Sequence, residues 1–269
     1  MNADTLRPFL SEKGAMVFTL TNNSYKFLTL NLIRSIQEAG APWKLAVFCA
    51  DTPSYNFFAR ENIPCRKHPS MIPDMGPEIM AFGTKNFQTL NRKKLELLAA
   101  LCATPEVKYG VYMDGDICVY KDFLPDLLER LEAGAAGAPA VGILMQCDEH
   151  NRVDCSGNSA PGACTNPCSG LIAWKHGAVD PVIFKVQEDT LPLWKEKPED
   201  QVFIQKMIRR TGTPLLTLPR ELYPNGMFAS LHAEGNPRKG ASMLLHYNYL
   251  VGNFKKRKMK ANGDWRIPY

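Results

Sequence analysis

The chain has 269 residues, of which 45% are hydrophobic and 22% charged, so it is long enough and apolar enough to form one globular domain with a large core. Its net charge of +5 is a mild excess that suits an anionic small-molecule ligand better than a nucleic-acid track, so no nucleic-acid partner is expected. Residues 1–14 are polar, and no later window holds the roughly 18 apolar residues of a membrane span. We therefore expect no signal peptide, no transmembrane segment and a cytoplasmic location.

The first part of the chain has the pattern of a strand, a helix and a second strand. An apolar run over 15–20 predicts a strand, helical spacing of apolar residues over 27–36 predicts a helix that stops at Gly40, and 44–49 predicts the second strand. Two strands joined through a helix form a βαβ unit, in which the strands run parallel. We therefore expect an α/β protein with a parallel sheet at this point.

Polar residues follow both predicted strands, at what would be the same edge of the sheet. We interpret this edge as a nucleotide-binding position, where Tyr25 stacks on a base and Asp51 accepts hydrogen bonds. The alternative is the ordinary polarity of surface loops. The candidate nucleotide-binding residues at this edge are Thr21, Asn22, Tyr25 and Asp51.

The next segment leads to a long helix with two adjacent lysines. The expected elements are a helix over 55–62, a strand over 63–68, a loop over 69–83 and a helix over 86–102. Lys93 and Lys94 lie on the last of these helices, about 20 residues before the next motif. One of them is a candidate contact for a phosphate or a sugar, and the alternative is that both are simply solvated.

The rest of the chain is organised around the stretch 107–120. It is apolar up to Met113, as in a buried parallel strand, and then Asp114 and Asp116 flank Gly115. Residues i and i+2 of an extended chain point the same way, ligands bind where parallel strands end, and glycine lets a bulky group approach the main chain. Two converging carboxylates repel each other unless a divalent cation lies between them. The pattern indicates a metal site, with a solvated turn as the alternative.

The second half continues the alternation of strands and helices, with no internal repeat and no interdomain linker. The expected elements are a helix over 124–132, a small-residue connector over 133–140, strands over 141–145 and 169–174, a helical start to 181–194, a helix over 202–210 and a strand over 214–218.

Four of the eight cysteines lie close together, in a segment rich in Asn, Ser, Gly and Pro. The gaps between Cys147, Cys155, Cys164 and Cys168 are seven, eight and three residues, which do not match the paired spacing of common zinc modules. Structural zinc, disulfide bonds and free thiols in a substrate-binding loop are the alternatives, and we expect free thiols.

Four motifs in this order resemble those of the nucleotide-diphospho-sugar transferases, which are glycosyltransferases of the GT-A fold. The chain is most similar to the plant cell-wall xylosyl- and arabinosyltransferases and their algal, protist and viral relatives. The likeness covers nearly the whole chain, and although Asp-x-Asp alone is weakly specific, four ordered motifs are more so. The motifs are Asp114-Gly115-Asp116, Cys168-Ser169-Gly170, Glu199-Asp200-Gln201, and His246-x-Asn248 followed by Gly252 and Lys255 or Lys256.

The resemblance implies a GT-A type, Rossmann-like mixed sheet that is mostly parallel and flanked by helices. It implies a single domain over 1–269, with nucleotide binding in about 14–120 and acceptor binding and catalysis in about 121–269. The implied donor is a UDP-linked sugar, and the implied acceptor is a hydroxyl of a glycan or glycoprotein.

The resemblance also supplies a third metal ligand, His246, beside Asp114 and Asp116. Together they would hold Mn²⁺, or Mg²⁺, which neutralises the departing diphosphate. Oxygen ligands with one imidazole favour manganese without excluding magnesium. The alternative for His246 is a structural histidine.

Further residues gain expected roles from the same resemblance. Gly252 would let the backbone approach the diphosphate, to which Lys255 or Lys256 would add a positive charge. In related retaining enzymes an Asp-Gln pair lies beneath the donor sugar, so Asp200 would hold sugar hydroxyls and Gln201 would face the anomeric carbon. Glutamine is a poor nucleophile, which implies front-face substitution with retention. The alternative for Asp200 is an acid that stabilises a helix N-terminus.

One residue departs from the pattern, because Cys168 stands where many relatives have asparagine. Two other functions also remain as alternatives. A haloacid-dehalogenase-type phosphatase shares the strand followed by Asp-x-Asp, but it needs a later acidic pair, and no acid follows the only later Gly-Asp at Asp264. The other alternative is a sugar-nucleotide- or glycan-binding relative that has lost turnover.

Overall fold

The computed structural model describes residues 3–77, 83–133, 141–148, 164, 166–226 and 240–268. Cys155 and most of the connector expected over 133–140 lie outside these residues. None of the described helices has the length and hydrophobicity to cross a bilayer.

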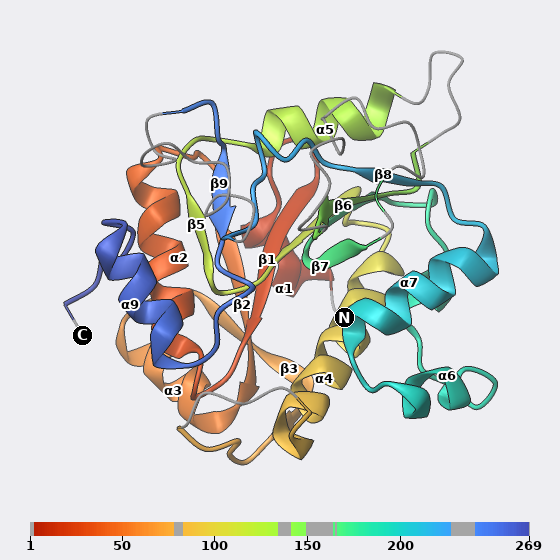
Figure 1. Ribbon diagram of the computed structural model, residues 1–269, viewed down its shortest axis with the longest axis horizontal. Helices are drawn as coiled ribbons and strands as arrows, with labels where there is room; N and C mark the ends of the chain where they lie inside the picture. The colour runs from red at the N-terminus through yellow and green to blue at the C-terminus, as the bar shows by residue number, and fades with distance from the viewer. Residues whose placement is uncertain are drawn as a thin grey trace.

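A seven-stranded sheet forms the centre of the molecule, in the order β3-β2-β1-β4-β7-β6-β8 (Figure 1). β7 is antiparallel to both of its neighbours, whereas the other neighbouring strands of this sheet pair in parallel. The prediction of a mixed, mostly parallel sheet is confirmed. The strands are β1 Ala15–Thr21, β2 Leu45–Asp51, β3 Cys65–Ile72, β4 Tyr109–Met113, β6 Ile143–Cys147, β7 Pro167–Lys175 and β8 Leu215–Thr217.

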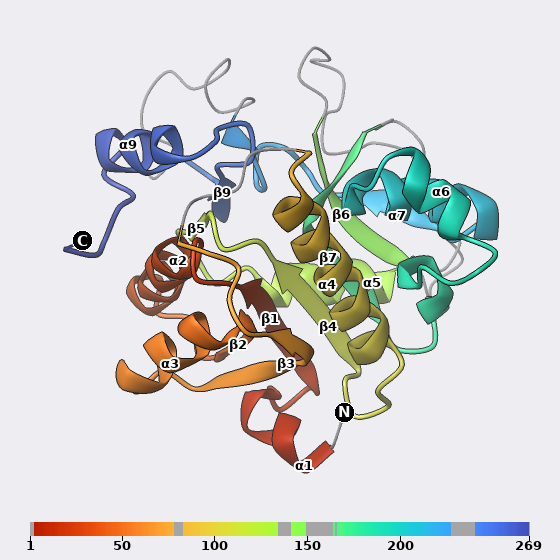
Figure 2. The ribbon, with the colours of Figure 1, turned by 90° about the horizontal axis from the view of Figure 1, so that it is seen from below.

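Helices pack on both faces of this sheet, as Figures 1 and 2 show. Phe18 of β1 belongs to a core shared with α4, η2 and α7, whereas its neighbour Val17 belongs to a core shared with α2, α3 and α5. β1 is therefore buried along its whole length, which explains its largely apolar sequence. The helices are α1 Ala3–Leu6, η1 Arg7–Phe9, α2 Lys26–Glu38, α3 Thr52–Arg60, α4 Lys85–Cys102, α5 Leu124–Ala133, η2 Pro181–Phe184, α6 Leu191–Glu196, α7 Asp200–Thr211 and α9 Asn253–Ala261.

A second, two-stranded antiparallel sheet joins β5 (Ile117–Val119) to β9 (Leu244–His246). In this pairing Ile117 lies opposite His246. The segment that follows the carboxylate motif is thereby fixed beside a histidine from the far end of the chain.

The structure differs from the sequence predictions at the end of β3 and at α9, and it confirms that 181–194 begins with helical structure. β3 continues through Pro69 to Ile72, where a loop was expected; it is an edge strand paired only with β2, and an edge tolerates the missing N–H of proline. The 181–194 segment holds the 3₁₀ helix η2 and the separate helix α6. Helix α9 was not predicted, because its two large apolar residues, Phe254 and Met259, form no helical stripe.

Candidate active site

The carboxylate motif lies where β4 ends and the chain turns into β5. Asp114 donates its backbone N–H to the carbonyl of Gly170 at 2.8 Å, and Ile117 donates to the carbonyl of Asp114 at 3.3 Å, which closes the turn. Tyr247 then donates its N–H to the carbonyl of Asp116 at 3.2 Å. Backbone bonds from three segments of the chain therefore fix both aspartates beside His246.

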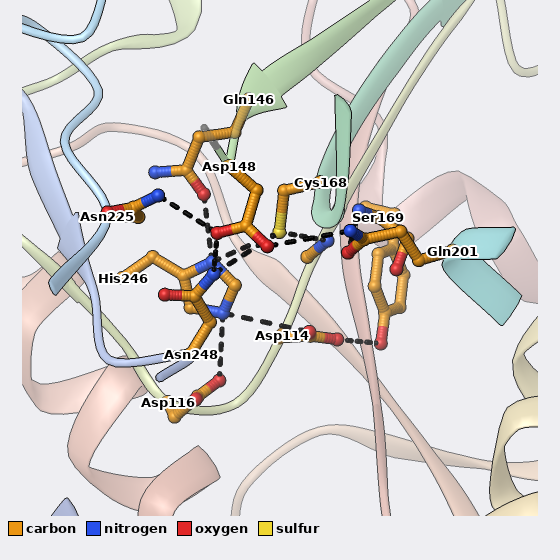
Figure 3. A network of polar contacts seen from close by, with 12 residues as sticks. Asp114, Asp116, Gln146, Asp148, Cys168, Ser169, Gln201, Asn225, His246 and Asn248 are labelled. Atoms are coloured by element: carbon orange, nitrogen blue, oxygen red, sulfur yellow. Dashed lines mark hydrogen bonds and ion pairs between the residues drawn. The ribbon is translucent and has the colours of Figure 1, made fainter. Parts of the chain in front are cut away.

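Asp114, Asp116 and His246 point toward one another (Figure 3). One potential ligand atom from each lies within 4.8 Å of the other two. The Nε2 atom of His246 is 3.4 Å from Asp116 Oδ1 and 3.7 Å from Asp114 Oδ2. That nitrogen is buried and forms no hydrogen bond, whereas Nδ1 lies 2.8 Å from the Oε1 acceptor of Gln146. With Nδ1–H donated to Gln146, loss of the Nε2 proton would leave a lone pair directed at the two carboxylates, the usual arrangement of a metal-binding histidine.

These three residues fit a divalent cation. An octahedral ion with bonds of about 2.1 Å separates its ligand atoms by about 3 to 4.2 Å, close to the spacing of this cluster. Gly170 adds a steric requirement, because a Cβ atom there would lie 2.0 Å from His246 Cε1 and 2.8 Å from Asp114 Oδ2. The ligand set therefore depends on a glycine in β7.

Two lysines pair with the acids of this site. Lys255 Nζ lies 2.5 Å from Asp116 Oδ2, and Lys94 Nζ lies 3.2 Å from Asp114 Oδ1 and 2.7 Å from Asp200 Oδ2. Burial opposes the ionisation of Asp116, but Lys255 and His246 hold the pKa of its carboxyl well below the ordinary value. Burial likewise lowers the pKa of His246, but Asp116 outweighs it and raises this pKa to about 10. Without a metal ion, positive side chains therefore surround the carboxylates.

Asp200 and Gln201 begin α7 on the other side of Asp114. Asp200 Oδ2 accepts a hydrogen bond from Ser169 Oγ at 2.8 Å, in addition to its ion pair with Lys94. The side-chain amide of Gln201 donates to Asn166 Oδ1 at 3.0 Å. Both residues of the predicted Asp-Gln pair thus lie beside β7, within reach of the metal-ligand cluster.

The structure adds an acidic residue, Asp148, that the sequence reasoning passed over. Its Oδ1 accepts hydrogen bonds from the amides of Asn225 at 2.9 Å and Asn248 at 2.7 Å, and its Oδ2 lies 3.5 Å from Gln201 Nε2 (Figure 3). The available signal was that Asp148 follows β6 directly, as Asp114 follows β4. Amide donors hold this carboxylate in the cleft without a positive partner among the described residues.

A cleft of about 330 Å³ connects these groups. Its lining combines the acids, His246 and both paired lysines with a few apolar side chains. The residues that line it are Leu20, Tyr25, Phe87, Leu90, Asn91, Lys94, Tyr112, Asp114, Gly115, Asp116, Asp148, Cys168, Ser169, Gly170, Glu199, Asp200, Gln201, His246, Asn248, Leu250, Val251 and Lys255.

Of the four residues predicted to bind the nucleotide after β1 and β2, only Tyr25 lines this cleft. Thr21 accepts a hydrogen bond from Thr29, and Asn22 caps its own loop by accepting from the N–H of Tyr25. Asp51 accepts from the backbone N–H groups of Asn23, Ser54 and Met75. Thr21, Asn22 and Asp51 are therefore placed to hold the loops of this sheet edge.

In each pair of adjacent lysines, only one lines the cleft. Lys94 and Lys255 line the cleft, whereas Lys93 donates to Ser70 Oγ in β3, and Lys256 Nζ lies 4.9 Å from the ring centre of Trp265.

The two predicted glycines also differ in position. Gly115 lines the cleft, and a Cβ atom there would lie 2.6 Å from Thr29 Oγ1. Gly252 lies outside the cleft lining and has a φ of 61°, a left-handed conformation that favours glycine at the residue before α9.

The cysteines form no metal cluster within the described part of the chain, where Asp114, Asp116 and His246 make up the one candidate group. Cys168 lines the cleft, with its sulfur 3.8 Å from His246 Nδ1. Cys147 and Cys164 are buried and pack together. The prediction of free thiols stands for Cys168, while Cys155 lies outside the described residues.

No protein-family model matches the sequence, and no curated protein matches it significantly. Solved structures do resemble it. Mouse xyloside xylosyltransferase 1, in its apo form, has a TM-score of 0.54 and 12% identity over 87% of this chain and 97% of its own. The galactosyltransferase LgtC, in complex with donor and acceptor sugar analogs, has a TM-score of 0.55 and 11% identity over 94% of this chain and 97% of its own. An active-site mutant of LgtC has a TM-score of 0.56 and 12% identity, with the same coverage. At these identities the likeness concerns the fold, and the chain has the fold of the GT-A glycosyltransferases.

Proposed function

We propose that the chain is a metal-dependent glycosyltransferase that moves a sugar from a nucleotide-diphosphate sugar, with UDP as the nucleotide, to an acceptor hydroxyl. This proposal depends mainly on one observation. In a cleft of a GT-A fold, a buried imidazole nitrogen without a hydrogen bond faces the carboxylates of Asp114 and Asp116. A buried polar atom without a partner is costly unless a ligand completes it.

Asp114, Asp116 and His246 would hold the cation, Mn²⁺ or Mg²⁺. When bound, the ion would offset the negative charge that develops on the departing diphosphate. Gln146 orients His246 through its Nδ1 atom, so that Nε2 stays available as a ligand. Lys255 lies at the same place, and we assign it the second positive charge that stabilises the diphosphate.

Asp200 and Gln201 are proposed to bind the donor sugar. Asp200 is held in place by Lys94 and Ser169, which leaves Oδ1 as the carboxylate oxygen for sugar hydroxyls. Gln201 offers an amide, a poor nucleophile, so we propose front-face substitution with retention, in which the leaving phosphate takes the proton of the acceptor hydroxyl. The solved LgtC mutant replaces a glutamine of that enzyme's active site by glutamate.

The acceptor is proposed to be a hydroxyl of a glycan or glycoprotein. LgtC is solved with an acceptor sugar analog, and the xylosyltransferase is named for a xyloside. The amide-held carboxylate of Asp148 gives this chain a further acceptor of sugar hydroxyl hydrogen bonds. The division into nucleotide binding in about 14–120 and acceptor binding in about 121–269 remains part of the proposal.

A panel of UDP-sugars, incubated with the protein and Mn²⁺ and analysed for free UDP, tests this function. We expect Asp114→Asn and Asp116→Asn each to reduce hydrolysis at least a hundredfold, which corresponds to about 3 kcal/mol of transition-state stabilisation. Asp189→Asn is the matched control, because that exposed aspartate pairs with Arg210 on the surface. Full activity in both site variants would contradict the proposal.

The same assay separates the alternatives. Donor binding without hydrolysis or transfer would indicate a binding protein that has lost turnover. Hydrolysis of simple phosphate monoesters would indicate a phosphatase, which the fold does not favour.

A further inference from the structure

The surface of α9 differs from the rest of the described exterior. Val251 and Phe254 are the large hydrophobic residues exposed among the described residues, at 39% and 64%. Phe254 lies in the first turn of α9 and Val251 two residues before this helix, which lies at the edge of the molecule beside α2 (Figures 1 and 2). Isolated exposed apolar residues are common, but two together on one short segment need an explanation.

Positive charge surrounds these apolar side chains. Phe254, Arg257 and Lys258 are spaced i, i+3 and i+4, so they share one exposed face of α9, and the guanidinium of Arg257 lies 4.4 Å from the Phe254 ring centre. Lys260 is exposed on the next turn. Within the described residues, none of these three basic side chains forms a salt bridge with an acidic group.

The opposite face of α9 is fixed to the protein. Met259 packs in a core cluster with Leu28 of α2, and Lys255 is paired with Asp116. The exposed face is therefore a fixed surface, with apolar side chains next to basic ones that have no acidic partner in the described part of the chain.

We propose that the surface formed by Val251 and by the exposed face of α9, with Phe254, Arg257, Lys258 and Lys260, binds an anionic lipid membrane. Helices that lie in a bilayer interface combine basic side chains, which meet anionic headgroups, with a Phe or Leu that enters the acyl boundary. A hydrated polyanion would meet the same charges but would leave Val251 and Phe254 in water, whereas a bilayer covers both.

The proposed membrane-binding face lies next to the cleft. Val251 and Lys255 also line the cleft, so a bilayer in contact with α9 would lie beside its opening. Under the proposed glycosyltransferase function, the cleft would then work on acceptors displayed at that membrane surface.

Sedimentation with vesicles of phosphatidylcholine, with and without phosphatidylglycerol, tests the proposal on the full chain. We expect binding to the anionic vesicles only, weakened by added salt because the charges are screened. Arg257→Gln combined with Lys258→Gln should weaken binding about twenty-five-fold, at about fivefold per basic side chain near an anionic surface. Phe254→Ala should weaken it about tenfold through lost apolar burial.

The control combines Lys13→Gln with Arg209→Gln, which removes the same charge from exposed positions elsewhere. It should bind vesicles as the unchanged protein does, and UDP-sugar hydrolysis in solution should be the same in all these variants, so the result is independent of the enzymatic proposal. Equal binding to neutral vesicles, or equal loss in the control, would overturn the inference. So would binding to a sulfated polysaccharide instead of vesicles, or self-association that Phe254→Ala abolishes.

Discussion

Replacement of Lys255 by methionine should change metal binding and nucleotide binding in opposite directions. The ammonium lies 2.5 Å from Asp116 Oδ2, and the two side chains are only 10% and 7% exposed. Removal of one partner from such a buried pair costs about 3 to 5 kcal/mol, because the other charge stays buried without compensation. A metal ion at Asp116 would remove that penalty in the variant, whereas in the unchanged protein it has to displace the lysine first.

We therefore expect Lys255→Met to bind Mn²⁺ at least about tenfold more tightly, which corresponds to about 1.4 kcal/mol. This gain is smaller than the cost of the unpaired Asp116 carboxylate, because His246 also faces that carboxylate. UDP binding at saturating Mn²⁺ should become about ten- to a hundredfold weaker, since a charge-assisted hydrogen bond to the diphosphate contributes about 1.5 to 3 kcal/mol. Electron paramagnetic resonance of free Mn²⁺ measures the first effect, and calorimetry measures the second.

Lys256→Met is the matched control, because it removes the same charge one residue along the helix, where the side chain contacts Trp265. It should change neither affinity more than twofold, the size of an ordinary surface effect. Unchanged or weaker Mn²⁺ binding by a folded Lys255→Met protein would refute the idea that Lys255 and the metal compete for Asp116.

Three further outcomes are expected. Gly170→Ala should abolish Mn²⁺ binding, measured by calorimetry, because the added Cβ would lie 2.0 Å from the His246 ring; retained affinity would mean that this ring is not a ligand. The raised pKa of His246 stabilises the metal-free fold fully below pH 6.5, and this contribution declines as the pH rises toward about 10. The free energy of unfolding, measured by urea titration, should therefore fall over that pH range, and it should fall less in His246→Gln. Because the proton must leave before the metal binds, Mn²⁺ affinity should instead rise with pH over the same range. Lys94→Met should lower the free energy of unfolding by about 3 to 5 kcal/mol, because two carboxylates lose their shared partner. Lys93→Met should lower it by less than about 1 kcal/mol. Equal effects of the two substitutions would contradict the assigned positions.

The sequence by itself determined the type of most elements and named the three residues that the structure brings together as a candidate metal site. The largely apolar run of β1 follows from burial on both faces of a parallel sheet, and a local pattern is enough to show it. Asp114 and Asp116 could be assigned together, because a spacing of two residues in an extended chain fixes a common direction. His246 could be paired with them only through the order of motifs, since nothing local links it to β5.

The tertiary structure alone decided which of several similar residues reach the cleft. Successive residues of a helix differ in direction by about 100°, so adjacent lysines such as Lys255 and Lys256 face different surroundings, and only the packing of the helix decides which one faces Asp116. Asp51 could not be distinguished from a ligand-binding acid, because the backbone N–H groups that use its carboxylate come from other segments of the chain. Local periodicity encodes secondary structure, whereas contacts between distant segments determine which polar side chains remain available to a ligand.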